Sequence, residues 1–135
     1  MIIITTQCFA PQIGGIESLM TGMAEAMTKN GKDVLVLADG IENESDKKAN
    51  YRIKRFGGWK PVRRINKALY LEKVCKNKTV ETIFADSWKS VEYVKKINKK
   101  ILVLAHGTEI PKQYWSIMID ILRFKKNRII NSYKN

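Results

Sequence analysis

The sequence is poor in cysteine, histidine and proline, with two, one and three of these residues among 135. Cys8 and Cys75 are far apart and form neither a metal-binding motif nor a disulfide framework, so a reducing cytoplasm is the expected compartment. The single histidine excludes zinc sites built on several histidines and mechanisms that need two. No apolar run approaches the roughly 20 residues that span a bilayer. The first residues lack a basic region and predict a strand, not a signal peptide.

Acidic residues are also scarce: the sequence has 13 of them and 25 lysines and arginines, which gives a net charge of +12. Residues 1–59 are balanced, with seven charges of each sign, and the surplus lies in 60–78, 89–100 and 123–135. Such a field attracts phosphates, anionic lipid or acidic substrates. Solvated helix faces of a lysine-rich protein explain it equally well. With no zinc finger and no aromatic RNA-binding motif in the basic stretches, no nucleic-acid partner is expected.

Short apolar runs alternate with longer amphipathic stretches along the chain. The runs predict strands, and the stretches at helical spacing predict helices. Strands are expected at about 2–5, 34–37, 51–56, 82–85, 101–105 and 128–131, and helices at about 16–30, 61–76, 87–98 and 111–126, with a polar loop over 39–50.

This rhythm is typical of βαβ units and a parallel sheet, and strands without polar alternation are covered on both faces. We therefore predict an α/β fold: a doubly wound, Rossmann-like open parallel sheet of about six strands, in the order 3-2-1-4-5-6, with helices on both faces. Ligands of such sheets bind beyond the carboxyl ends of the strands. The segments at those ends are Thr6–Gly15, the 39–50 loop, Ala85–Ser87 and His106–Glu109.

Two glycines, Gly14 and Gly15, open the first helix directly after the first strand. A helix start exposes unpaired N–H groups and a partial positive charge, and glycine lets a phosphate approach the backbone. The spacing matches neither a dinucleotide fingerprint nor a P-loop, and a plain β–α turn is the simpler interpretation of the pair alone.

The segment after the strand at 101–105 contains the only histidine, His106, followed by Gly107, Thr108 and Glu109. An imidazole there can hydrogen-bond a hydroxylated ligand or transfer a proton, or it can cap the next helix. After the strand at 82–85 come Asp86 and Ser87, for which capping a helix is the simpler role, and Trp88, which suits ligand stacking or core packing.

A second glycine pair, at 57–58, precedes a helix whose start is rich in cations: Lys60, Arg63, Arg64 and Lys67. We expect Val62, Ile65, Leu69 and Val74 to cover the core and the cations to face an anionic membrane surface or an acceptor. A merely solvated face fits the same pattern.

Four motifs taken in order resemble the N-terminal domain of the family 4, or group 1, nucleotide-sugar glycosyltransferases. Phe9, Pro11, Gly14, Gly15 and Glu17 match that family's Phe-x-Pro-x-x-Gly-Gly-x-Glu. The other three matches are Asn30-Gly31 with Val34 and Val36, then His106-Gly107 with Glu109, and finally Ile129-Ile130-Asn131-Ser132. The resemblance covers nearly the whole chain.

The resemblance implies a GT-B enzyme that transfers sugar with retention and without a metal or other cofactor. It implies that residues 1–135 form the acceptor-side domain, with a nucleotide-sugar as donor and a glycan or lipid-linked molecule as acceptor. By the same resemblance, Gly14 and Gly15 face the donor diphosphate, His106 contacts the transferred sugar, and Glu17 and Glu109 lie in the cleft. With them we place Asp86, Ser87, Trp88, Gly107 and Thr108 as cleft or acceptor residues.

The family's C-terminal donor-binding domain has no counterpart in these 135 residues. We therefore expect this chain alone to be inactive, to bind nucleotide-sugar weakly and to self-associate. A peripheral position at the inner face of the membrane is compatible with the basic helices. The alternative is a stand-alone α/β module that binds an acidic small molecule or an anionic surface without catalysis.

Overall fold

The computed structural model describes residues 1–104, which form one parallel α/β sheet with its helices. The elements are β1 (Ile2–Thr6), α1 (Gly15–Lys29), β2 (Val34–Asp39), α2 (Glu44–Lys48), β3 (Arg52–Phe56), α3 (Lys60–Asn77), β4 (Thr82–Ala85), the 3₁₀ turn η1 (Trp88–Ser90) and β5 (Ile101–Val103). The five strands are ordered β3-β2-β1-β4-β5, and every neighbouring pair is parallel. The predicted order is thus confirmed for these five strands, while the helix and strand expected at 111–126 and 128–131 lie outside the described residues.

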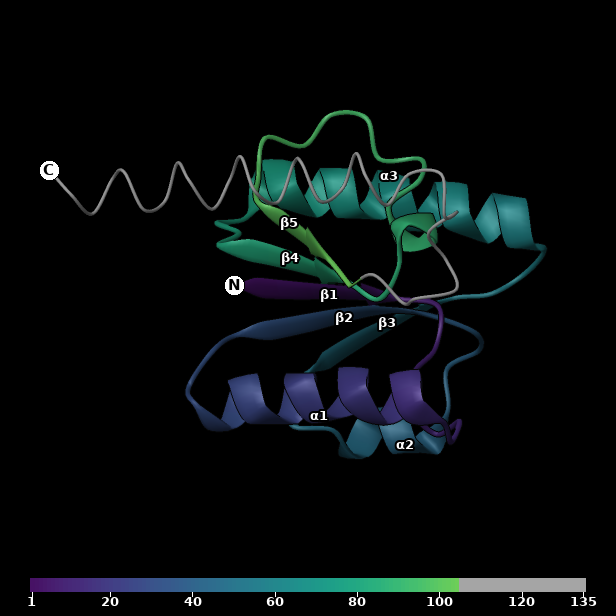
Figure 1. Ribbon diagram of the computed structural model, residues 1–135, viewed down its shortest axis with the longest axis vertical. Coiled ribbons are helices and arrows are strands. Elements are labelled where there is room, and N and C mark those ends of the chain that lie inside the picture. The colour runs from purple at the N-terminus through teal and green to yellow at the C-terminus, as the bar shows by residue number, and fades with distance from the viewer. Residues whose placement is uncertain (105–135) are drawn as a thin grey trace, which may run out of the picture. The chain divides into compact units, whose positions relative to one another are not determined.

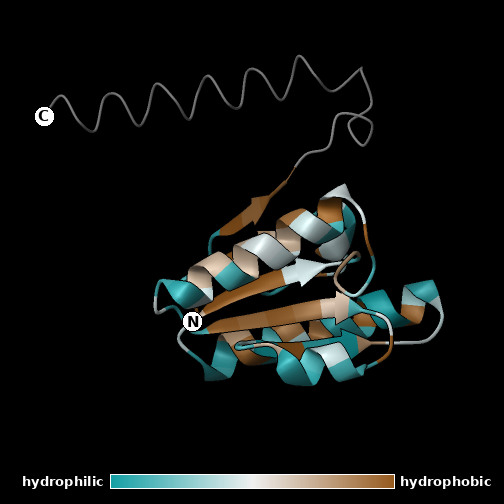
Figure 2. Ribbon diagram, turned by 90° about the horizontal axis from the view of Figure 1, so that it is seen from below, coloured by the Kyte–Doolittle hydropathy of each residue, from teal (hydrophilic) through white to brown (hydrophobic). Residues whose placement is uncertain are grey.

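The central strands β1 and β2 are buried along their whole length, as their uninterrupted apolar sequence predicts. Their side chains alternate between two cores. Ile4 and Val36 pack with Met20 of α1, whereas Ile3 and Leu37 pack with Leu71 of α3. Figure 1 accordingly shows α1 and α2 on one side of the sheet and α3 on the other. In Figure 2 the central strands are hydrophobic while the helices carry both colours.

Helix α1 ends where the sequence predicts, since Gly31 follows with a φ of 77°, a conformation that glycine adopts without strain. Helix α3 carries proline in its first turn, as expected. The polar 39–50 segment is not all loop. The short helix α2 forms there because Asn43 and Asp46 make a reciprocal capping box.

The helix expected at 87–98 is wrong. The structure has only the η1 turn there, followed by irregular chain. The backbone N–H groups of Lys95 and Lys96 donate to the Glu72 carboxylate of α3, at 2.7 and 3.1 Å, instead of to carbonyls of their own segment. A tertiary hydrogen-bond acceptor therefore replaces the helical one, and Val94 and Ile97 still pack against the core.

Strand β5 is not the most buried strand, although its sequence is the most apolar. It pairs with β4 at the margin of the described sheet, and Leu102 and Val103 are 38% and 43% exposed. At the other margin, β3 alternates exposed and half-buried residues, as an edge strand should.

Candidate functional site

Polar residues gather where β1, β2 and β4 end, at the carboxyl edge of the sheet. Thr6 closes β1, Asp39 closes β2 and Asp86 follows β4, and all three are buried. Because the three strands are neighbours in parallel register, these side chains lie at one edge. This is the position at which open α/β sheets bind ligands.

Asp86 and Ser87 fasten the chain that leaves β1. The Asp86 carboxylate accepts hydrogen bonds from the Thr6 hydroxyl at 2.8 Å and from the Gln7 N–H at 2.7 Å, and also from the Ser90 hydroxyl. Ser87 Oγ accepts one from the Gln7 amide nitrogen at 3.0 Å. Both side chains are buried, so their contacts position the β1–α1 loop, whereas the neighbouring Trp88 is half exposed.

Lys67 corrects an expectation, because it lies in the interior and not on a cationic surface. Only 1% of it is exposed, and its Nζ donates to Asp39 Oδ1 at 2.6 Å and to the Thr6 carbonyl oxygen at 3.0 Å. Arg63 Nε donates to the other Asp39 oxygen at 2.8 Å. Burial lowers the pKa of Lys67, and the negative charge of Asp39 opposes that effect.

The predicted inward face of α3 is wrong for three of its four residues, since Val62, Ile65 and Leu69 are 49%, 41% and 59% exposed, whereas Val74 packs against the core as predicted. Because Lys67 points inward with Ala68 and Leu71, residues about half a turn away must point outward. The buried ion pair therefore sets the rotation of the helix.

The remaining cations of α3 differ in their surroundings. Arg64 pairs with Glu92 at 3.2 Å and reaches the Gln7 side-chain oxygen at 3.4 Å, while its Nε is buried and has no hydrogen-bond partner within residues 1–104. Lys60, by contrast, is exposed in the first turn. Of the four predicted surface cations, only Lys60 is thus both exposed and without a hydrogen bond or ion pair to another residue of the described range 1–104.

The glycine pair lies at the start of α1, with Gly14 as the N-cap in an extended conformation. The first helical hydrogen bond runs from the Ser18 N–H to the Gly14 carbonyl, so the preceding amides are not used within the helix. A methyl group on Gly14 would clash with Glu17 Oε2, because the Glu17 carboxylate folds back over the N-cap. Gly15 faces open space.

Cys8 lies in the loop between β1 and α1, near Glu17. Partial burial raises the pKa of its thiol, and the negative charges of Glu17, Asp86 and Asp39 raise it further. The thiol is therefore protonated at neutral pH, which is opposite to the state that a cysteine nucleophile requires.

Sequence reasoning missed the second buried ion pair, between Arg55 and Asp46. Arg55 Nε and Nη2 each donate to an Asp46 oxygen at 2.7 Å, and the side chains are 4% and 10% exposed. Arg55 also donates to the carbonyl oxygens of Asp39 and Ala10. The capping-box spacing of Asn43 and Asp46 was the available signal for α2, but nothing in β3 distinguishes Arg55 from a solvated edge residue.

The four residues His106, Gly107, Thr108 and Glu109 lie outside the described residues. Their expected position at the carboxyl edge of the sheet, on the same edge as the glycine pair, stays a prediction. Within residues 1–104 no group of three or more His, Cys, Asp or Glu side chains is placed to hold a metal ion. No helix in the same range is long and apolar enough to cross a membrane.

Comparison of the chain with models of known protein families and with curated proteins gives no match.

Proposed function

We propose that this chain is the acceptor-side domain of a retaining glycosyltransferase that takes sugar from a nucleotide-sugar and passes it to a glycan or lipid-linked acceptor. The observation that carries the proposal is the position of the Gly14-Gly15 helix start. It follows the central strand β1 at the carboxyl edge, beside the ends of β2 and β4. The proposal includes the finer fold, a doubly wound Rossmann-like sheet with a sixth strand.

The groups at the carboxyl edge are better suited to binding a diphosphate than to acting as a general acid or base. The amides before Ser18 are not used within α1, and Gly15 presents no side chain to an approaching phosphate. The buried Asp39 and Asp86 are committed to Lys67, Arg63 and the β1–α1 loop. Their side chains therefore hold the loop that leads to the helix start. His106 is proposed as the residue that contacts the transferred sugar.

The Glu17 carboxylate occupies the space above Gly14 and repels an incoming phosphate. A donor must therefore displace this side chain or bind beside it, over Gly15. The Glu17 side chain is half-buried but flexible, so it can move at modest cost, and nucleotide-sugar binding is expected to be weak but measurable.

Charge substitution at Gly15 tests the proposal. Since nothing lies within 4 Å of a Cβ built there, Gly15→Asp should fold normally while placing a carboxylate where the phosphate binds. Gly22→Asp is the matched control, because Gly22 also faces open space but lies in the middle of α1. Calorimetry with UDP-glucose, UDP-galactose and GDP-mannose should show weak binding of at least one donor, abolished by Gly15→Asp alone. No binding by any donor, or equal effects of both variants, would contradict the proposal.

A second candidate function, attachment to an anionic membrane surface, is favoured by the exposed stripe of α3. Val62, Ile65 and Leu69 follow Trp59, which is 75% exposed, and the exposed Lys73 lies one turn after Leu69, while Lys60 is exposed in the first turn of the helix. Apolar side chains flanked by cations suit the interface of a bilayer that contains anionic lipid.

Vesicle co-sedimentation tests this second candidate. The chain should sediment with phosphatidylglycerol vesicles more than with phosphatidylcholine vesicles, and Ile65→Gln with Leu69→Gln should reduce that binding. The control pair Asn66→Gln with Asn77→Gln changes two exposed residues of α3 and alters neither the stripe nor the net charge. Equal sedimentation with both lipids, or none, would remove the idea.

A further inference from the structure

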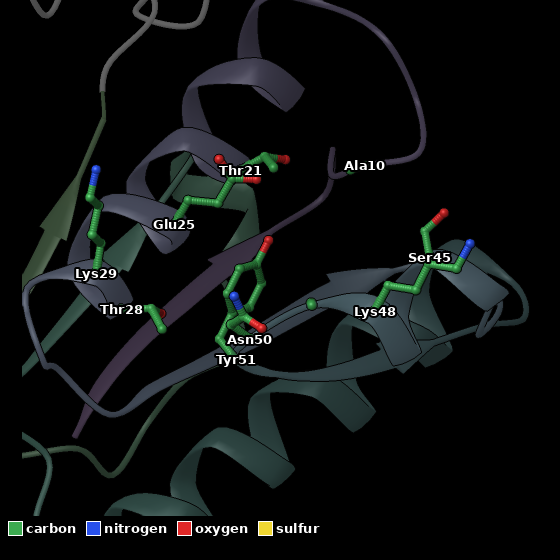
Figure 3. A pocket seen from close by; sticks show the side chains of 10 residues that line it. Ala10, Thr21, Glu25, Thr28, Lys29, Ser45, Lys48, Asn50 and Tyr51 are labelled. Carbon is green, nitrogen blue, oxygen red and sulfur yellow. The ribbon is translucent and has the colours of Figure 1, made fainter.

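A pocket of about 630 Å³ lies on the flank of the domain, between α1, α2 and the start of β3. Figure 3 shows its lining: Thr21, Glu25, Thr28 and Lys29 come from α1, Ser45 and Lys48 from α2, and Asn50 and Tyr51 from the segment that enters β3. Its volume is within the range of roughly 300–1,000 Å³ found for small-molecule sites. None of the residues assigned to the carboxyl-edge site lines it.

One polar atom of the pocket lining has no hydrogen-bond partner within residues 1–104. Thr21 Oγ1 is buried without a hydrogen-bond partner, which is costly unless a ligand or water supplies one. In Figure 3 the Tyr51 hydroxyl points toward the Glu25 and Thr21 side chains. The Tyr51 ring is fixed from behind by Phe9, edge to face at 6.3 Å between centroids. Hydroxyl, amide and carboxylate groups thus converge around one held aromatic ring.

The wall formed by α2 is held in place from beneath. This five-residue helix buries none of its own residues, and too short a helix is unstable by itself. The buried Arg55–Asp46 pair fastens it to β3, and Arg55 also binds the Ala10 carbonyl at the pocket margin. The pocket is therefore largely preformed, which reduces the ordering cost of binding.

The charges disfavour an ionic ligand. Burial raises the pKa of Tyr51, and the negative charges of Glu25 and Asp46 raise it further while the positive charge of Arg55 opposes them. In Figure 3 the Tyr51 hydroxyl points toward the Glu25 side chain, whose carboxylate repels an anion placed there. Figure 3 shows Lys29 at one end of the groove and Lys48 at the other, where they repel cations. A neutral ligand rich in hydroxyl groups avoids both penalties and can donate to Glu25 and accept from Asn50.

We propose that this pocket binds a neutral sugar unit of disaccharide size, at a site separate from the carboxyl edge of the sheet. The Tyr51 ring provides the apolar surface, and the Thr21, Glu25 and Asn50 side chains provide the hydrogen bonds. This inference does not depend on the proposed function, since the pocket and the Gly14-Gly15 helix start share no residue.

Two-dimensional NMR of the full 135-residue chain tests the proposal, with maltose, cellobiose and N,N′-diacetylchitobiose as probes. At least one disaccharide should shift the amides of Thr21, Asn50 and Tyr51 with a millimolar dissociation constant. Glu25→Gln and Asn50→Ala should each weaken it several-fold. The matched controls are Glu44→Gln and Asn66→Ala, both exposed and outside the pocket, and neither should change the affinity.

Inorganic phosphate serves as the ionic probe and should leave the same amides unshifted. The proposal is overturned if no disaccharide shifts them, if phosphate does so instead, or if the controls weaken binding as much as the pocket variants. Because the Gly15→Asp variant retains the pocket, its disaccharide affinity should be unchanged, which separates failure of this proposal from failure of the proposed function.

Discussion

Substitutions at the Asp39–Lys67 pair should destabilise the domain to different extents, because the two residues leave different groups unpaired. Asp39→Asn removes the carboxylate that binds Lys67 and, among residues 1–104, leaves the buried ammonium with the Thr6 carbonyl oxygen. Removing one partner of a buried ion pair costs about 3–5 kcal/mol of unfolding free energy. We expect a loss in that range.

Lys67→Met should cost less, because Asp39 keeps Arg63 at 2.8 Å and methionine fills most of the lysine's volume. The expected loss is about 1.5–3 kcal/mol, that of one hydrogen bond to a charged group. The double variant should lose less than the sum of the two, since neither charge is then left without its partner. Lys73→Met, on the exposed side of the same helix, is the control and should change stability by no more than about 0.5 kcal/mol.

Urea denaturation followed by far-UV circular dichroism measures these differences as shifts in the midpoint at constant slope. In Asp39→Asn the loss should shrink as pH rises toward 10, because Asp39 opposes the lowering of the Lys67 pKa by burial. Without that carboxylate the folded pKa is lower still, so the stability of the variant rises with pH more than that of the unsubstituted chain. If Asp39→Asn and Lys73→Met have the same midpoint, the buried pair does not hold α3 to the sheet and the reasoning fails.

Two further outcomes follow from the site's electrostatics. Gly14→Ala should displace the Glu17 carboxylate and thereby lower the pKa of the Cys8 thiol. Little stability should be lost, because the Gly14 backbone is extended. A Cys8 ¹³Cβ titration that the substitution leaves unchanged would contradict this prediction. The hydrogen bonds from Arg55 hold the pKa of Asp46 below its usual range. The stability that they contribute is complete above about pH 4 and is lost as pH falls through the lowered folded pKa. Asp46→Asn should remove that part of the acid sensitivity in urea denaturation, and a pH profile identical to that of the unsubstituted chain would contradict the prediction.

The sheet could be predicted from the sequence because its signal is local. Uninterrupted apolar runs separated by helical stretches determine strand identity, and the β–α alternation determines parallel pairing. The orientation of α3 could not be predicted, because counting Val62, Ile65 and Leu69 as core assumes that lysine faces water. Only the position of Asp39, 28 residues away, makes the interior favourable for Lys67. The absence of a helix at 87–98 could not be predicted either, because the backbone there donates to Glu72, which is distant in the sequence.

Part of the candidate site could likewise be predicted from the sequence, and part of it could not. The sequence located Gly14, Gly15, Asp86 and Ser87 correctly at the ends of strands, since that follows from chain order alone. It could not show that Asp86 and Ser87 bind the β1–α1 loop, because hydrogen-bond partners 80 residues apart are set by packing. The Arg55–Asp46 pair was missed for the same reason.

The amide signals of the α1 start provide the most direct test of the proposed donor site. In a titration of the isotope-labelled 135-residue chain with the nucleotide-sugars used for calorimetry, the largest shifts should fall on Gly14, Gly15 and Ile16, and the same donors should leave the middle of α1 unchanged. The assignment of the glycine pair as the diphosphate-binding turn would be contradicted if only the amides of the α3 lysines shift, or if no amide at the carboxyl edge shifts.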